Sequence, residues 1–344
     1  MSGLVRLEHG LITVAFAAYL VGAVLYIVYI SFRKDSAARF GRSILYIGIT
    51  LHAVSIILRG VNSGHAPFSN MYESLSFFAW GTTAIFLYVE RRYRLIALGA
   101  FSTPITVLIM GYASVMSREA APLVPALQSY WLWIHVMTCF AAYAAFAISL
   151  SASLMYFGKK DKDFRVTAVV IFVLALFVGF AILYSHKFNL SDLTHTIRHY
   201  MTFVISIVAL VVSGLYLIIP ASRRRFGKSL LEQIPSEDDL DKISYQLIKF
   251  AFPFLSLGII TGAVWANYAW GRPWSWDPKE TWSLITWFIY AIYLHARITA
   301  GWKGRRAALV NILGFVSVIF TYIGVNFMLS GLHSYAQALF RIFA

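Results

Sequence analysis

The sequence predicts an all-α, polytopic transmembrane helical bundle. Of its 344 residues, 59% are hydrophobic and only 13% are charged, about half the roughly 25% charged residues of a typical soluble domain. Apolar runs close to 20 residues long recur along the chain, and its mean hydropathy is +0.70. Because lipid offers the backbone no hydrogen bonds, each such run is expected to cross the membrane as a helix.

We expect about ten spans, separated by short loops that are too small to form a folded domain of their own. The chain is therefore expected to be a single integral membrane domain over residues 1–344. The first run has no clear cleavage site and further spans follow it, which favours a retained helix over a signal peptide. The predicted spans are 10–32, 43–60, 72–89, 95–112, 131–157, 166–185, 200–220, 244–266, 282–300 and 307–329.

The positive charge is distributed unevenly between the two sets of loops. Of the 29 Lys and Arg residues, 20 fall in one set and seven in the other set and the termini. The positive-inside rule then places both termini, and the loop around residues 267–281, outside. Since topology accounts for the net charge of +14, no nucleic-acid partner is expected. The basic-rich loops are 33–42, 90–94, 158–165, 221–243 and 297–306.

Within the longest basic-rich loop, Ser236 precedes three acidic residues, which is typical of a helix start. We expect a short surface helix there, leading into the span from residue 244.

One aromatic stretch, WANYAWGRPWSWDPKETWSLITW at residues 265–287, holds six of the ten tryptophans. An interfacial tryptophan belt would spread them over many helix ends instead. Gly271 and Pro273 are expected to bend the backbone, so that Trp270, Trp274 and Trp276 face one site. Such an aromatic wall suits a large, flat, apolar ligand.

The charged residues of this stretch have structural and binding interpretations that are compatible. Asp277, Pro278 and Glu280 form the pattern of a capping box at a helix start. Arg272 and Lys279 are available for anionic groups of a ligand, or as ordinary surface charges.

Two histidines are expected at the level of this aromatic stretch. His135 lies about four residues into a span that starts outside, roughly 6 Å deep, and His333 follows the last span. Imidazole is a common axial ligand of haem iron, so the pair suits a bis-histidine haem site.

Other histidines and the single cysteine have weaker claims. His295 is expected roughly 20 Å below the start of its span, where an ionisable group is a functional candidate, and His52 lies mid-span with less support. For both, the alternative is hydrogen bonding to a neighbouring helix. The i,i+4 pair His195 and His199 is interpreted as a surface feature. Cys139 has no partner for a disulfide and is expected to pack.

At this point the motifs resemble those of a known family. WGRPWSWDPKETWSLITW resembles the WWD motif of haem-handling membrane proteins. Together with four further segments, it is similar to the CcsA/ResC-type subunit of the System II cytochrome c synthase. Those segments are NMYESL at 70–75, HVMTCFAAYAAF from His135, AIYLHAR at 291–297 and GLHSY at 331–335.

The resemblance implies a role in cytochrome c biogenesis. Such a complex takes haem b from the inside and holds it at the outer face. There it is joined by two thioether bonds to the CxxCH motif of an apocytochrome c. The family's two external histidines map to His135 and His333, and its intramembrane histidine maps to His295.

The resemblance also implies partners and a location. The second intramembrane ligand belongs to a CcsB/ResB-type membrane subunit, with His52 as a substitute candidate. The location is a bacterial inner membrane or a thylakoid-like membrane, with the site on the outer, periplasmic face. The client cytochromes and the oligomeric state stay open.

The implied site combines ligands, aromatic walls and charges, with no catalytic residue beyond those that position haem. The expected haem-handling core comprises residues 43–157 and 244–335 and contains the WWD motif at 265–287. A two-span insertion of unknown role is expected at residues 158–228. Two other functions are weighed. A haem transporter without attachment activity would use the same residues, whereas a b-type electron-transfer subunit would usually pair histidines deep in its helices, and the pair here is expected at the outer surface. The implied cofactor-binding residues are His135, His333, His295, Trp270, Gly271, Arg272, Trp274, Trp276, Asp277, Lys279 and Glu280.

Overall fold

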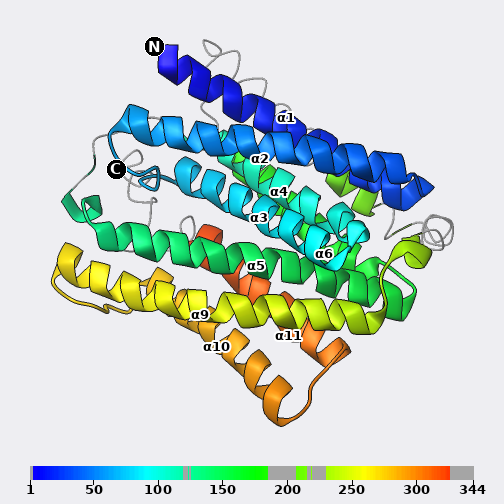
Figure 1. Ribbon diagram of the computed structural model, residues 1–344. Coiled ribbons are helices and arrows are strands. Elements are labelled where there is room, and N and C mark those ends of the chain that lie inside the picture. Colours follow the sequence, from blue (N-terminus) through cyan, green and yellow to red (C-terminus); the bar gives the residue numbers. More distant parts are fainter. Residues whose placement is uncertain are drawn as a thin grey trace. The chain divides into compact units, whose positions relative to one another are not determined.

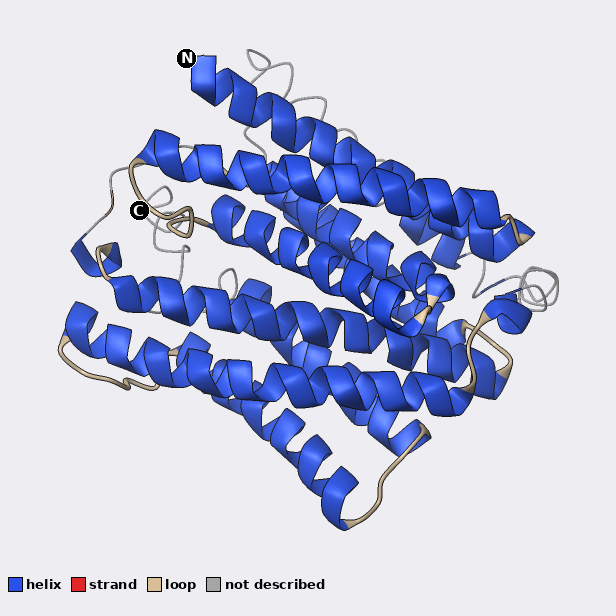
Figure 2. Cartoon of the chain, in the orientation of Figure 1, coloured by secondary structure: helices blue, strands red, loops and turns tan. Residues whose placement is uncertain are grey.

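The computed structural model describes residues 3–118, 123, 125–184, 207–214, 218 and 230–325. Within these ranges all regular structure is helical and no strand occurs (Figure 2). The all-α prediction is therefore confirmed. The chain divides into two compact units: residues 1–122 with 154–240, and residues 123–153 with 241–344.

The first unit is built on two long apolar helices, α1 (Gly3–Phe32) and α2 (Asp35–Ser63), which pack side by side (Figure 1). Helix α2 ends at Gly64, whose φ of +70° is the left-handed conformation that favours glycine. Asn70 caps the next helix by accepting a hydrogen bond from the backbone N–H of Glu73 at 2.9 Å.

Three further helices belong to this unit: α3 (Met71–Tyr93), α4 (Gly99–Val115) and α6 (Arg165–Tyr184). Helix α4 packs on α1, α3 and α6. A short 3-10 helix, Ile96–Leu98, leads into α4. Gly99 permits the close approach to α1, since a Cβ there would overlap the ring of Tyr26.

One end of the first unit is joined by a buried ionic group. Glu90 on α3 is 1% exposed. It accepts hydrogen bonds from the Tyr26 hydroxyl at 2.7 Å and from Arg42 Nη2 at 2.8 Å. The carboxylate therefore links α1, α2 and α3, and its charge is neutralised by a guanidinium.

The second unit contains residues 130–153 of α5 (Tyr130–Asp161), most of α9 (Glu237–Trp270), α10 (Pro278–Thr299) and α11 (Arg305–Ile319). A π-helical turn, Phe320–Gly324, continues α11. Polar contacts tie these helices together inside the unit. Asn311 on α11 donates to Ser149 and Ser153 on α5, both at 2.8 Å.

Asp241 holds the connection between α10 and α11. It accepts 2.5 Å and 2.7 Å hydrogen bonds from Arg297 and a 2.9 Å hydrogen bond from the backbone N–H of Gly304. This bidentate pair fixes the end of α10 that carries His295.

Nine of the ten predicted spans correspond to described helices, with the ends shifted by a few residues. Six helices in the described ranges are long and apolar enough to cross a membrane: α1, α2, the 3-10 turn with α4, α5, α9, and α11 with its π turn. The protein is thus a membrane protein. The ten-span count, the outer location of the termini and the side of the tryptophan loop remain predictions. Span 200–220 lies mostly outside the described residues.

One expected element is wrong. The acidic segment after Ser236 does not form a separate surface helix, because α9 runs without a break from Glu237 to Trp270. Ser236 does cap it, accepting a 3.1 Å hydrogen bond from the Asp239 backbone N–H. The capping signal was correct, but nothing between it and the apolar run breaks the helix.

Candidate functional site

The tryptophan loop of the second unit turns at two positions of positive φ. Helix α9 ends at Trp270, and Gly271 follows with φ of +73°. Trp276 has φ of +58°, which is uncommon for a bulky residue and indicates a backbone held by its surroundings. Its side chain is 69% exposed. The loop therefore presents an indole at its surface.

The predicted capping box at the start of α10 is confirmed. The Asp277 carboxylate accepts from the backbone N–H of Lys279 at 3.1 Å, and Glu280 accepts from that of Asp277 at 3.2 Å. Glu280 also accepts a 2.8 Å hydrogen bond from the Ser275 N–H. Both carboxylates thus hold the loop against the helix start, whether or not they also contact a ligand.

The tryptophans form two edge-to-face pairs. Trp265 and Trp270 have ring centroids 4.8 Å apart at 65°, and Trp274 and Trp276 have centroids 5.8 Å apart at 90°. Trp282 packs at 4.1 Å on Phe320, in the π-helical turn. A common wall formed by Trp270, Trp274 and Trp276 remains a prediction.

His135, on α5, is held by its backbone and aromatic neighbours. Its Nδ1 lies 2.6 Å from the carbonyl oxygen of Gly258 on α9, which assigns the proton to Nδ1 and the lone pair to Nε2. Its ring lies 6.1 Å from that of Trp265, nearly parallel at 15°. A backbone carbonyl on one ring nitrogen is the usual arrangement for a histidine that binds metal through the other.

Two glycines and the cysteine were missed as part of this arrangement. A Cβ on Gly262 would lie 2.6 Å from His135 Nδ1, and one on Gly258 would lie 2.5 Å from the Cys139 sulfur. Cys139 is buried, as expected, with its sulfur 3.7 Å from His135 Nδ1. The signal available in the sequence was the four-residue spacing of Gly258 and Gly262, typical of close helix packing in membranes.

Lys279 points into the second unit, and Arg272 does not. The Lys279 ammonium lies 5.7 Å from the ring centroid of Tyr322. Burial lowers the pKa of Lys279 to about 8, while the nearby Asp277 carboxylate and the Cys139 thiol act in the opposite direction. Arg272 is exposed on the loop. Of the two cations Arg272 and Lys279, Lys279 is therefore the one whose charged group lies among other side chains.

The other histidines considered as ligands in the sequence fall into three groups. His295 is on α10 with its side chain exposed. His52 is fully buried in the first unit, and both ring nitrogens are engaged, by the Tyr19 hydroxyl at 3.0 Å and by the Ser76 hydroxyl at 2.7 Å. The alternative interpretation of His52, hydrogen bonding to neighbouring helices, is thus the one observed. His333, His195 and His199 lie outside the described residues.

Among the residues that the structure describes, no three or more His, Cys, Asp or Glu side chains gather as they would to hold a metal ion by themselves. The helices and the site together define an all-helical membrane protein with an indole-rich loop beside an oriented imidazole.

Comparison with known proteins identifies the family. The family model described as cytochrome C assembly protein matches residues 68–170 and 157–333. The curated relatives are named cytochrome c biogenesis protein CcsA. That of Gloeobacter violaceus is 36% identical over 343 residues, covering 97% of each chain. That of Pyropia yezoensis is 36% identical over 338 residues, covering 96% of this chain and 97% of the relative. That of Crocosphaera subtropica is 40% identical over 285 residues, covering 80% and 82%.

The chain therefore belongs to the cytochrome c assembly protein family. The resemblance to CcsA-type proteins, predicted from the WDPKETW motif and its companions, is confirmed, and with it a role in cytochrome c biogenesis.

Proposed function

We propose that this chain exports haem b and presents it at the outer membrane face, where an apocytochrome c receives it through its CxxCH motif. The observation that carries the proposal is His135, whose Nδ1 is bound to the Gly258 carbonyl and whose ring is stacked on Trp265. With its proton on Nδ1, the imidazole carries its lone pair on Nε2, the nitrogen that would bind iron in this proposal. We propose His333 as the second ligand; it lies outside the described residues.

In this proposal the loop supplies the surroundings of the porphyrin. Trp270, Trp274 and Trp276 contact its faces and edges. Lys279 and Arg272 pair with the propionates. The fit is supported by Lys279, which is half-buried with its ammonium 5.7 Å from the Tyr322 ring centroid, because a partly desolvated cation gains from an anionic partner. Asp277 and Glu280 act by holding the loop, as their hydrogen bonds indicate.

The attachment reaction is an addition that needs neither oxidant nor leaving group. The S–H bond of each apocytochrome cysteine is broken, the sulfur bonds to one vinyl carbon of haem, and the other vinyl carbon gains a proton. The protein contributes chiefly by positioning, which can supply of order 7–11 kcal/mol in favourable cases. No described residue is assigned as the base that takes the thiol proton.

We further propose that His295 binds haem within the membrane, together with a ligand from a CcsB/ResB-type subunit. An imidazole exposed on the side of a helix is costly in lipid and favours a covering partner or ligand. The engaged nitrogens of His52 disfavour it as the second ligand. The expected membrane is a bacterial inner membrane or a thylakoid-like one, with the outer site on its periplasmic side.

The experiment that tests this function is co-expression of the chain with a CxxCH apocytochrome, with and without a CcsB-type subunit. Haem that stays on the cytochrome after denaturation measures thioether formation. We expect covalent haem only when both membrane subunits are present, and none with the His135→Ala variant. Haem export without covalent product under every condition would favour the transporter. Haem bound to the chain at wild-type levels, with neither haem export nor covalent attachment, would favour the b-type electron carrier.

A further inference from the structure

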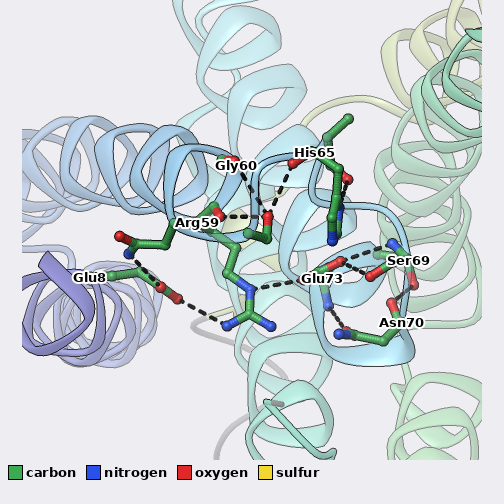
Figure 3. A network of polar contacts seen from close by, with 11 residues as sticks. Glu8, Arg59, Gly60, His65, Ser69, Asn70 and Glu73 are labelled. Atoms are coloured by element: carbon green, nitrogen blue, oxygen red, sulfur yellow. Dashed lines mark hydrogen bonds and ion pairs between the residues drawn. The ribbon is translucent and has the colours of Figure 1, made fainter. Parts of the chain in front are cut away.

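A second group of buried polar residues lies in the first unit, where the proposed haem chemistry does not use it. Glu8 on α1, Arg59 on α2 and Glu73 on α3 converge (Figure 3). Their exposed fractions are 1%, 6% and 2%. Glu73 belongs to the NMYESL motif. Buried ionisable residues in spanning helices are functional candidates because their burial is costly.

The two carboxyl groups differ in how well they are hydrogen-bonded. Glu73 accepts from Arg59 Nε at 2.8 Å and from the Ser69 backbone N–H and hydroxyl, both at 2.8 Å. This set of donors suits an ionised carboxylate. Glu73 is thus the charged partner of Arg59.

Glu8 has much weaker support. Its Oε2 accepts one 3.3 Å hydrogen bond from Asn62. Its Oε1 accepts none from the described residues, and the nearest guanidinium nitrogen, Arg59 Nη1, is 3.9 Å away. The other charges facing it are the Glu73 carboxylate and Arg118, which follows α4 and lies over the ring of Tyr72 at 4.6 Å. Arg59 donates its Nε–H to Glu73, while Arg59 Nη2 and Arg118 Nε and Nη1 make no hydrogen bond to any described residue. A Glu8 carboxylate is therefore held by one hydrogen bond and an ion pair at 3.9 Å, which compensates its desolvation less fully than the donors of Glu73 do. Glu8 is therefore the carboxyl group of this cluster that is suited to hold a proton.

A small cavity adjoins these groups, and its size decides what it can hold. Its volume is about 10 Å³, and Glu8, Arg59, Glu73 and Ser76 are among its lining residues. This is roughly the space of one water molecule. A phosphate or a carboxylate ligand does not fit, although the guanidinium groups would attract either. The cavity therefore suits a water molecule that exchanges protons with Glu8.

From this cavity a hydrogen-bonded path leads towards the middle of the helices. Ser76 lines the cavity, and its hydroxyl lies 2.7 Å from His52 Nε2. His52 Nδ1 lies 3.0 Å from the Tyr19 hydroxyl. His52 is fully buried. Each group on this path can both donate and accept, as proton transfer along a chain requires.

We propose that Glu8 is a proton-binding site and that the cavity water and Ser76 relay its proton to His52. In one transfer the O–H bond of Glu8 breaks and an N–H bond forms at His52 Nε2, which leaves a Glu8 carboxylate 3.9 Å from Arg59 Nη1 and a positively charged His52 imidazolium. The water and the Ser76 hydroxyl each give one proton and take another. No oxidant, reductant or cofactor takes part, and the reverse transfer restores Glu8.

The proton on Glu8 is tested by infrared spectroscopy of the full chain in lipid nanodiscs, in H₂O and D₂O. A protonated carboxyl group has a C=O band that shifts on deuteration. Glu8→Gln is expected to abolish one such band, and Glu8→Asp to keep a displaced band. The matched control, Glu237→Gln on the protein surface, should leave it intact. A spectrum that Glu8→Gln does not change would overturn the proton-binding site.

The relay is tested by the hydrogen exchange of the His52 ring N–H in ¹⁵N-histidine spectra, with the signal assigned by its loss in His52→Gln. Ser76→Ala removes the only side chain that joins the cavity to His52 in the described hydrogen bonds. It is expected to slow this exchange about tenfold or more. Ser74→Ala is the control, since the Ser74 hydroxyl donates to the backbone carbonyls of Asn70 and Met71 on its own helix. Equal exchange rates in the two variants would contradict the relay. Neither measurement depends on haem.

Discussion

The imidazole of His135 lies almost parallel to the indole of Trp265, at 15° and 6.1 Å, while its Nδ1 is 2.6 Å from the Gly258 carbonyl. The indole is itself fixed, since Trp265 Nε1 donates a 2.8 Å hydrogen bond to the Ala126 carbonyl. Two contacts of different kinds thus set the orientation of one ring, so a change in either helix α5 or helix α9 should be detected at His135.

Gly262→Ala should displace the His135 ring. The new Cβ would lie 2.6 Å from Nδ1, which is too close without a shift of the ring or the helix. We expect a loss of about 1–3 kcal/mol in stability, as for other overpacked sites, and weakened haem binding. Thermal unfolding and bound-haem spectra measure the two effects.

The control for this change is Gly10→Ala on α1, where a Cβ would meet nothing within 4 Å. Alanine is the better helix former, so this variant should keep or slightly raise stability, by roughly 0.5–1 kcal/mol. If both variants bound haem like the wild type, the close packing around His135 would have no bearing on the ligand.

Lys279 should titrate near pH 8. Burial disfavours its charged form, so its folded-state pKa of about 8 lies below the roughly 10.4 of a free lysine. The unfavourable contribution to stability is therefore complete below pH 8, declines between pH 8 and about 10.4, and vanishes above. Lys279→Met should stabilise the apo-protein at pH 7, and the difference from wild type should shrink as the pH rises to 10.

Denaturation curves at several pH values check this, with Lys303→Met as the control on an exposed lysine. Haem propionates near the ammonium should raise the pKa of Lys279, which ¹³C-labelled dimethyl-lysine spectra with and without haem can follow. A stabilising effect of Lys279→Met that stays constant with pH would contradict the burial of its charge.

Asp277→Ala should weaken the start of α10. It removes the acceptor for the Lys279 backbone N–H, at 3.1 Å, and we expect a loss of about 1 kcal/mol, within the usual 0.5–2 kcal/mol for such caps. Asp277→Asn keeps an acceptor and should retain most of the stability. Thermal unfolding of both variants separates the capping hydrogen bond from the charge. If Asp277→Asn loses as much stability as Asp277→Ala, the charge of the carboxylate has a role beyond the cap.

His52→Phe should cost stability without altering haem ligation. It removes the partner of both the Tyr19 and Ser76 hydroxyls, and buried polar groups left without a partner cost about 1–3 kcal/mol each. Bound-haem spectra, normalised to folded protein, should match the wild type. A change in the haem band of the folded variant would instead make His52 a ligand.

The helices could be predicted because apolar length and capping residues are local signals. The Asp277 to Glu280 pattern defined a helix start, and the structure has the same capping hydrogen bonds. By contrast, the contacts of His135 with Gly258 and Trp265 join residues 123 and 130 positions away along the chain. No local pattern encodes such pairings, so the helix that carries His135 could be predicted but not the neighbours of its ring.

The two histidines predicted at membrane depth illustrate the same limit. His52 and His295 both occur in apolar runs, yet one is fully buried between helices and the other is exposed on α10. The difference arises from which helix face meets a neighbour. The Glu8, Arg59 and Glu73 cluster was missed for a related reason, since its members come from three helices and each alone resembles a helix-end charge.

The most direct test of His135 as an iron ligand is the bound-haem spectrum of His135→Ala, purified with the proposed CcsB-type subunit, with and without added imidazole. We expect loss of the outer haem and its recovery when imidazole occupies the vacated coordination position, whereas His65→Ala should bind haem like the wild type. Full haem occupancy with unchanged spectra in His135→Ala, without imidazole, would contradict the assignment of His135 as an iron ligand.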